Sequence, residues 1–111
     1  RNLTAEDWDD PDVVKVETAE DRTATTFFRT PSPRSDRNRC AKHLGIYGFK
    51  KEFLLRFARM ERTENEITLG LEQMRVLDHG IPISVAITDL DSIGINRPED
   101  IERLKESATV A

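Results

Sequence analysis

The runs Val13-Val14-Lys15-Val16-Glu17 and Thr23-Ala24-Thr25-Thr26-Phe27-Phe28 decide how this chain is expected to fold. Both are rich in β-branched and aromatic residues, which favour strands. The mostly polar segment 18–22 separates them, and two strand-forming runs joined in this way are typical of a β-hairpin. The sequence therefore predicts a hairpin over residues 13–28, although its turn contains no glycine.

The segments on either side of the hairpin lack a regular pattern. Residues 1–12 show no sustained periodicity and are expected to be an irregular lead-in. Residues 30–41 contain two prolines, which disfavour a regular helix, so an extended arm is expected there. The hairpin and the arm together make up residues 13–42, and residues 43–107 form the remainder.

Strands and helices are expected to alternate over residues 43–107. Three apolar segments are predicted to be strands: 43–49, 83–87 and 93–95. Phenylalanines recur at helical spacing at positions 49, 53 and 57, so residues 50–60 are predicted to form an amphipathic helix.

Two further helices have recognisable starts. Thr63 and Glu66 form a capping box, and the helix that it opens is expected to run through Gly70 and to stop near Gly80. Asn96, which precedes a proline and two acids, is expected to cap a C-terminal helix. The whole chain is therefore predicted to be one α/β domain.

Composition excludes several classes of protein. The chain has 111 residues, 34% charged and 37% hydrophobic, as expected for one globular domain. A net charge of −4 argues against a general nucleic-acid-binding protein, whose surface would be strongly basic. Cys40 has no partner for an intrachain disulfide and no apolar run reaches membrane-spanning length, so a cytoplasmic protein is expected. Because the chain begins with Arg1 and not Met, it is expected to be part of a longer protein.

The residues alone indicate little chemistry. There is no glycine-rich phosphate loop, no cluster with metal-ligand spacing and no nucleophile motif. Arginines at positions 29, 34, 37 and 39 suit a carboxylate or phosphate ligand, and a solvated basic loop is the alternative. His43, at the head of a predicted strand, fits a structural role as well as a functional one.

Four segments in chain order resemble motifs of one family. Residues 10–16, followed by Phe27-Phe28-Arg29, match its Pro-x-Val-Val-Lys-Val and aromatic-x-Arg segments. His43-Leu44-Gly45-Ile46-Tyr47-Gly48-Phe49 is close to its His-Leu-Gly-Ile-Tyr-x-aromatic strand, and Leu71-Glu72-Gln73-Met74-Arg75-Val76-Leu77 to its Leu-Glu-Gln-Leu-Arg-x-Leu helix. Residues 94–101 parallel Gly-x-Val-Asp-Thr-Pro-Glu-Asp-Leu. In these motifs the chain resembles the C-terminal half of CMP-Kdo synthetases, which are 3-deoxy-manno-octulosonate cytidylyltransferases.

The resemblance implies a fold and a reaction. The fold is the C-terminal half of a nucleotide-diphospho-sugar transferase, in a homodimer to which the hairpin and arm contribute. The reaction transfers CMP from CTP to the acid sugar Kdo for lipopolysaccharide biosynthesis, and pyrophosphate leaves. Magnesium neutralises the phosphates, so catalysis depends on positioning and charge stabilisation.

The resemblance also implies which residues bind the sugar. Arg29 would pair with the carboxylate of Kdo, and the hydroxyls would bond to His43, Tyr47, Glu72 and Gln73. Each position has a structural alternative, because Tyr47 also suits core packing and Glu72 and Gln73 also suit an exposed helix face.

Two departures from the family pattern affect the expected activity. The nucleotide-binding half has no counterpart here and would precede Arg1, so the chain alone is expected to be inactive. Asn96 stands where the family has a second magnesium-binding aspartate, and it offers a neutral carbonyl where magnesium prefers a carboxylate. Asp89 or Asp91 would be needed to compensate. The alternatives are a cytidylyltransferase for another acid sugar, such as N-acylneuraminate, or a non-catalytic dimerisation module.

Overall fold

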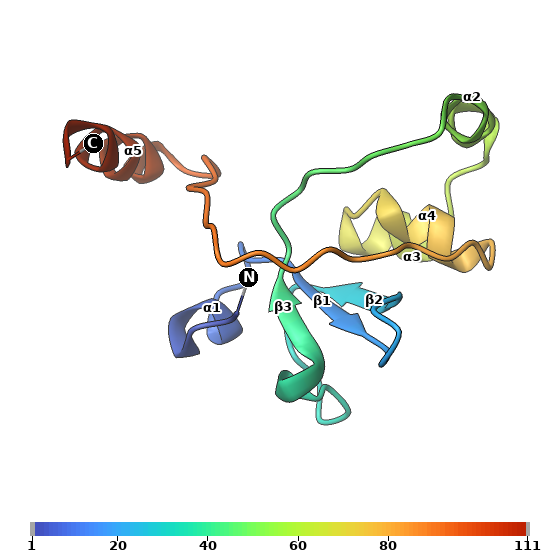
Figure 1. The fold of residues 1–111 in the computed structure, drawn as a ribbon, viewed down its shortest axis with the longest axis horizontal. Helices are drawn as coiled ribbons and strands as arrows, with labels where there is room; N and C mark the ends of the chain where they lie inside the picture. Colours follow the sequence, from blue (N-terminus) through green and yellow to red (C-terminus); the bar gives the residue numbers. More distant parts are fainter. Residues whose placement is uncertain (1, 111) are drawn as a thin grey trace.

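A three-stranded antiparallel sheet forms the base of the molecule (Figure 1). The computed structural model describes the backbone of residues 2–110 and the side chains of residues 2–108. Strands β1 (Lys15–Thr18) and β2 (Ala24–Phe28) form the predicted hairpin, with Val16 opposite Phe27. Its turn needs no glycine because Arg22 takes the left-handed conformation, with φ of 63°.

The arm after the hairpin returns to the sheet. It passes through a short 3₁₀ helix, η1 (Arg37–Arg39), and ends in strand β3 (Cys40–Lys42), which pairs with β1. The strand order is therefore β2-β1-β3. The sequence predicted an extended loop over residues 30–41. This is corrected at its end, where a 3₁₀ turn precedes a strand, because β1 offers a free edge to which β3 adds.

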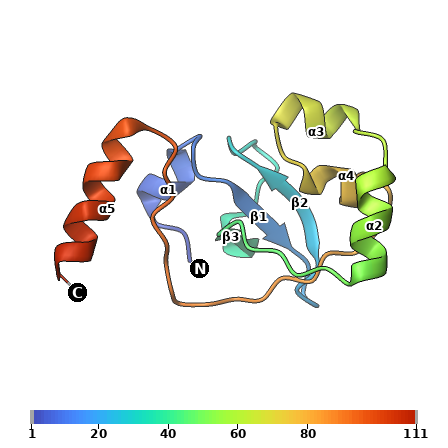
Figure 2. The ribbon, with the colours of Figure 1, turned by 90° about the horizontal axis from the view of Figure 1, so that it is seen from above.

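Helices α3 (Glu64–Leu69) and α4 (Gln73–Asp78) lie beside the sheet on its β2 side (Figures 1 and 2). The sequence predicted one continuous helix here, and this was wrong. Gly70 ends α3 in the left-handed conformation, with φ of 65°, and the chain turns before α4 begins. The hydrophobic core joins these helices to the sheet through Val16, Phe27, Leu71 and Met74, among other residues.

The other helices lie outside this core. Helix α1 (Ala5–Asp9) forms within the predicted irregular lead-in, because Thr4 and Asp7 make a capping box that periodicity did not reveal. Helix α2 (Lys51–Arg59) confirms the predicted amphipathic helix, and α5 (Pro98–Val110) confirms the C-terminal one. In both ribbon views α2 and α5 lie at opposite ends of the molecule.

The three strands predicted after residue 42 do not form. Segments 43–49 and 93–95 have no ladder partner among the described residues, and segment 83–87 makes a single bridge between Ser84 and Thr23. A strand needs a neighbour for its backbone N–H and C=O groups, and apolar sequence alone does not supply one. Among the described helices, none has the length and apolar character needed to cross a bilayer.

Candidate functional site

A cleft of about 1070 Å³ opens between two extended segments and two helices. Residues 43–50 form one wall with α2, and residues 81–88 and the start of α4 form the other. Four of the five residues predicted to bind the sugar line it: His43, Tyr47, Glu72 and Gln73. The structure therefore brings together side chains that lie 30 positions apart in the sequence.

His43 and Tyr47 form a hydrogen-bonded pair in the cleft. The Tyr47 hydroxyl lies 2.5 Å from Nε2 of His43. The sheet holds His43 in place, because its backbone N–H donates to Val14 at 2.9 Å and its ring packs edge-on against Phe27. Burial lowers the pKa of His43, so its ring is neutral at pH 7 and can accept a hydrogen bond. Burial, together with the charge of Glu72, raises the pKa of Tyr47, which therefore keeps its proton.

An aromatic wall continues from this pair towards α2. Phe49 stacks on Phe53 with ring centroids 6.0 Å apart and lies 5.9 Å from Phe57. No described residue of α2 is buried, so the apolar face of the helix lines the cleft. The spacing of the phenylalanines predicted the helix, but the sequence gave no sign that its apolar face would border a cleft and not a packed core.

Gln73 is a polar residue of the cleft whose buried amide nitrogen lacks a partner among the described residues. It is 9% exposed, and its Nε2 atom has no hydrogen-bond partner among the described residues. A buried amide N–H without a partner costs about 1–3 kcal/mol. Gln73 is the first residue of α4, so the turn at Gly70 decides where its side chain points. The cleft therefore contains a buried donor available to a ligand.

Arg29 does not line the cleft. It follows β2, and its Nε donates to the carbonyl of Leu69 at 3.3 Å, at the end of α3. Its own carbonyl accepts from Nζ of Lys15 at 2.5 Å, and Lys15 is fully buried. Burial lowers the pKa of Lys15, while neighbouring aspartates oppose this shift. Arg29 is thus held at the α3–α4 junction by Leu69, which lies four residues before Gln73 in the chain. Lys15 is a support that the sequence did not reveal.

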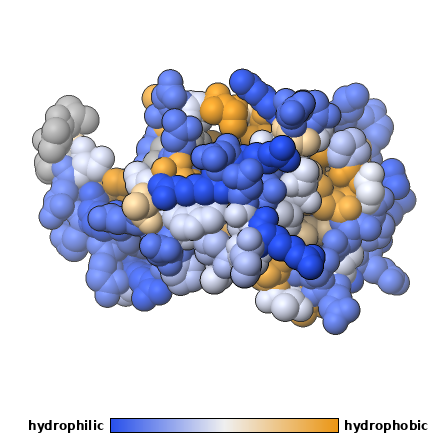
Figure 3. Space-filling model, turned by 90° about the horizontal axis from the view of Figure 1, so that it is seen from below, coloured by the Kyte–Doolittle hydropathy of each residue, from blue (hydrophilic) through white to orange (hydrophobic). Residues whose placement is uncertain are grey.

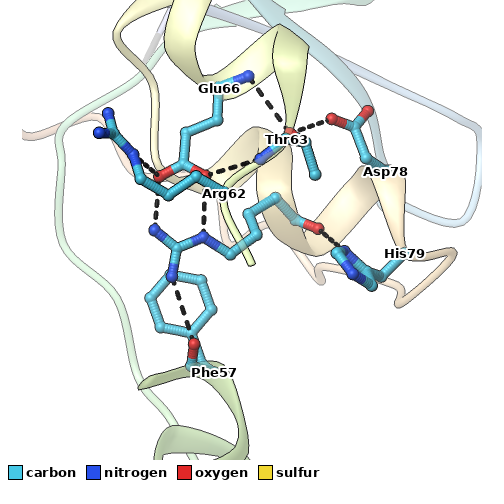
Figure 4. Close-up of polar contacts among 7 residues, drawn as sticks. Phe57, Arg62, Thr63, Glu66, Asp78 and His79 are labelled. Carbon is cyan, nitrogen blue, oxygen red and sulfur yellow. Dashed lines mark hydrogen bonds and ion pairs between the residues drawn. The ribbon is translucent and has the colours of Figure 1, made fainter. Parts of the chain in front are cut away.

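A buried ion pair supports the α3–α4 junction (Figure 4). Arg75 donates through Nε and Nη2 to the two carboxylate oxygens of Glu66, at 2.8 and 2.5 Å. These bonds hold the pKa of the Glu66 carboxyl below its usual range. Arg75 also donates to the carbonyl of Phe57 at 3.2 Å and lies over its ring, so one side chain connects three helices. The capping box at Thr63 was predicted and is confirmed, but the role of Arg75 was missed.

The residues around Asn96 do not fit a magnesium site. Asn96 is exposed and offers one neutral amide. Across the described part of the chain, no three His, Cys, Asp or Glu side chains come together as a ligand set, so neither Asp89 nor Asp91 completes one. Asp91 instead accepts from Lys42 at 3.1 Å.

Comparison with known proteins places these features in context. No family model matches the chain. It is 38% identical over 120 residues to the 3-deoxy-manno-octulosonate cytidylyltransferase of Geotalea uraniireducens, covering 96% of this chain and 48% of the relative. It is 40% identical over 100 residues to the enzyme of that name from Solibacter usitatus, covering 86% of this chain and 39% of the relative.

A solved structure is also similar. It is that of CMP:2-keto-3-deoxy-manno-octonic acid synthetase complexed with CTP, with a TM-score of 0.74 and 27% identity over 96% of this chain and 46% of that one. The chain thus spans about half the length of the proteins that it matches. The predicted resemblance to the C-terminal half of CMP-Kdo synthetases and the predicted fold class are confirmed.

Proposed function

We propose that this chain is the sugar-binding part of a cytidylyltransferase that transfers CMP from CTP to Kdo. The relatives carry the name of that activity, and the similar structure was solved with CTP. In the proposed reaction a hydroxyl oxygen of Kdo forms a bond to the α-phosphorus of CTP. The bond from that phosphorus to the β-phosphate oxygen breaks, pyrophosphate leaves and the hydroxyl loses its proton.

The observation that carries the proposal is the unpartnered amide of Gln73. A sugar hydroxyl in the cleft would accept the hydrogen bond that Nε2 does not make within the protein. Hydrogen bonds to such a donor discriminate strongly, because the site is left with a buried unpaired group when the ligand lacks the matching atom. Gln73 therefore combines affinity with selection for a hydroxylated ligand.

The neighbouring residues suit the same ligand. The His43–Tyr47 pair can exchange hydrogen bonds with hydroxyls, and the Glu72 carboxylate can accept from them. The aromatic wall of the cleft would cover the carbon face of the sugar and exclude water. We propose that Arg29, beside the α3–α4 junction, pairs with the carboxylate of Kdo.

The remaining parts of the proposal follow from the resemblance. They are a homodimer in which the hairpin and arm take part, a cytoplasmic location and a role in lipopolysaccharide biosynthesis. Magnesium stays a prediction, because the described residues lack a carboxylate ligand set that would hold it.

The test is Kdo binding to the chain, measured by calorimetry. We expect Gln73→Leu to weaken Kdo binding about tenfold, because the lost hydrogen bond contributes about 1.4 kcal/mol. The same change should leave thermal stability equal or higher, because it removes an unpartnered buried donor. Glu64→Gln, an exposed change on α3 outside the cleft, is the control. Equal Kdo affinity in Gln73→Leu would contradict the proposal, and tighter binding of N-acetylneuraminate than of Kdo would favour the other acid-sugar reading.

A second experiment addresses turnover. The 111-residue chain, given CTP, Kdo and magnesium, should release pyrophosphate only at background, because it spans about half of its relatives. Turnover by this chain alone would show that the nucleotide site is also within it.

A non-catalytic dimerisation module is the alternative that one observation favours. Several large apolar side chains are strongly exposed, including Ile46 at 85% and Leu90 at 77%. Surfaces of this kind promote self-association. A module would dimerise in light scattering and show no Kdo binding, whereas the sugar-binding proposal requires Kdo binding whatever the oligomeric state.

A further inference from the structure

The turn that leads into α5 is closed by its own side chains. One carboxylate oxygen of Asp100 accepts the backbone N–H of Asn96 at 2.9 Å and that of Arg97 at 3.0 Å. Its other oxygen faces Nη1 of Arg103 at 3.5 Å. These bonds hold the pKa of the Asp100 carboxyl below its usual range, with the N–H of Asn96 as the largest cause. The Asp100 carboxylate is therefore already occupied in capping the helix.

A carboxylate of the lead-in is occupied as well. Oδ2 of Asp12, from the lead-in, pairs with Nε of Arg97 at 2.6 Å. The guanidinium groups of Arg97 and Arg103 thus lie beside these carboxylates, and their positive charge opposes the binding of a metal cation. Magnesium also requires near-octahedral oxygen ligands and gives up its water reluctantly. One exposed amide oxygen at position 96 does not meet that requirement.

We propose that the Asn96–Asp100 turn is a helix-capping structure that holds no divalent cation. Any cation that accompanies CTP is then bound without a carboxylate from this turn. The expectation that position 96 is a metal ligand comes from the family resemblance and not from the proposed transfer of CMP. It concerns cation binding itself, so it can be tested without turnover.

The experiment is a titration of the chain with Mn²⁺ alone, followed by paramagnetic broadening of the backbone amide signals in NMR. For the wild type and for Asn96→Ala we expect the same weak, non-localised broadening. For Asn96→Asp we expect broadening centred on residues 94–100 at a Mn²⁺ concentration about tenfold lower, because a carboxylate replaces the amide. Localised broadening in the wild type that Asn96→Ala removes would overturn the proposal. An unchanged response in Asn96→Asp would support it, because the neighbouring charges would then exclude the cation even from a carboxylate.

A second variant separates capping from cation binding. Asp100→Asn should reduce the helix content of α5, seen in its chemical shifts, and leave the Mn²⁺ response of the wild type unchanged. Loss of a localised Mn²⁺ response in Asp100→Asn would make Asp100 a cation ligand and overturn the proposal. Because neither readout uses Kdo or CTP, failure here is distinct from failure of the proposed CMP transfer.

Discussion

The sheet and the cleft wall are built from similar residues but differ in burial and in strand pairing. In the sheet, Val16 and Phe27 are 3% and 2% exposed and lie on paired strands. In the cleft wall, Ile46 and Phe49 are 85% and 42% exposed, on a segment that pairs with no strand among the described residues. On the face drawn in Figure 3, hydrophobic patches interrupt a mostly hydrophilic surface. Apolar β-rich sequence becomes a strand only where another strand completes its hydrogen bonds.

The largest expected effect comes from removing a ring on each side of this comparison. Phe27→Ala should lower the free energy of unfolding by about 3–5 kcal/mol, because it leaves a cavity in the core. Phe53→Ala, in the partly exposed cleft wall, should cost less than about 1 kcal/mol by the same reasoning. Urea unfolding measures both. Equal losses would show that the cleft wall is packed as tightly as the core.

The next effect concerns the ion pair that joins the two regions. Arg75→Leu leaves the Glu66 carboxylate buried without its main partner and should cost about 3 kcal/mol. Arg62→Ala removes only an exposed partner of the same carboxylate and should cost less than about 1 kcal/mol. A loss in Arg75→Leu no greater than that in Arg62→Ala, measured in urea, would mean that the pair does not support the junction.

A smaller effect is expected at the turn that aims Gln73 into the cleft. Gly70→Ala should cost about 1 kcal/mol, because an L side chain is strained at φ of 65°. Gly48→Ala, in the cleft wall, is the matched control, since its φ is not positive and no atom lies within 4 Å of the added methyl. Thermal unfolding compares the two. If Gly48→Ala costs as much as Gly70→Ala, backbone strain is not the reason for the glycine.

The sequence predicted features that depend on nearby residues better than features that depend on distant contacts. The hairpin and the capping box at Thr63 were predictable because each depends on residues close together in the chain. The break at Gly70 was not, because a glycine inside a helical pattern is compatible with either a weak helix or an end. The strand at 43–49 was predicted wrongly, since pairing depends on a distant neighbour. Four site residues were placed together in one cleft, but their roles came only from the resemblance.

The smallest expected effect is the pH dependence of stability that comes from the buried His43 in the cleft wall. Because its pKa in the folded protein is lowered, the unfolded chain takes up a proton first as the pH falls below about 6.5. The unfolded state then binds more protons than the folded state, so stability should decrease as the pH falls from 7.5 towards the lowered pKa. His43→Gln removes this contribution, and its melting temperature should depend less on pH than that of the wild type.

The control for this prediction separates burial from hydrogen bonding. Tyr47→Phe removes the hydroxyl that contacts Nε2 of His43 but keeps the ring that packs beside it at 5.3 Å. Since burial is the cause of the lowered pKa, Tyr47→Phe should retain the pH dependence of the wild type while melting at a lower temperature. Melting temperatures at pH 7.5, 6.5 and 5.5 (about one unit apart, on either side of the ordinary histidine pKa) distinguish the variants. A melting temperature of Tyr47→Phe that does not change with pH would assign the lowered pKa of His43 to the hydrogen bond with Tyr47. The His43 ring in the cleft wall would then be more hydrated than the side chains of the sheet.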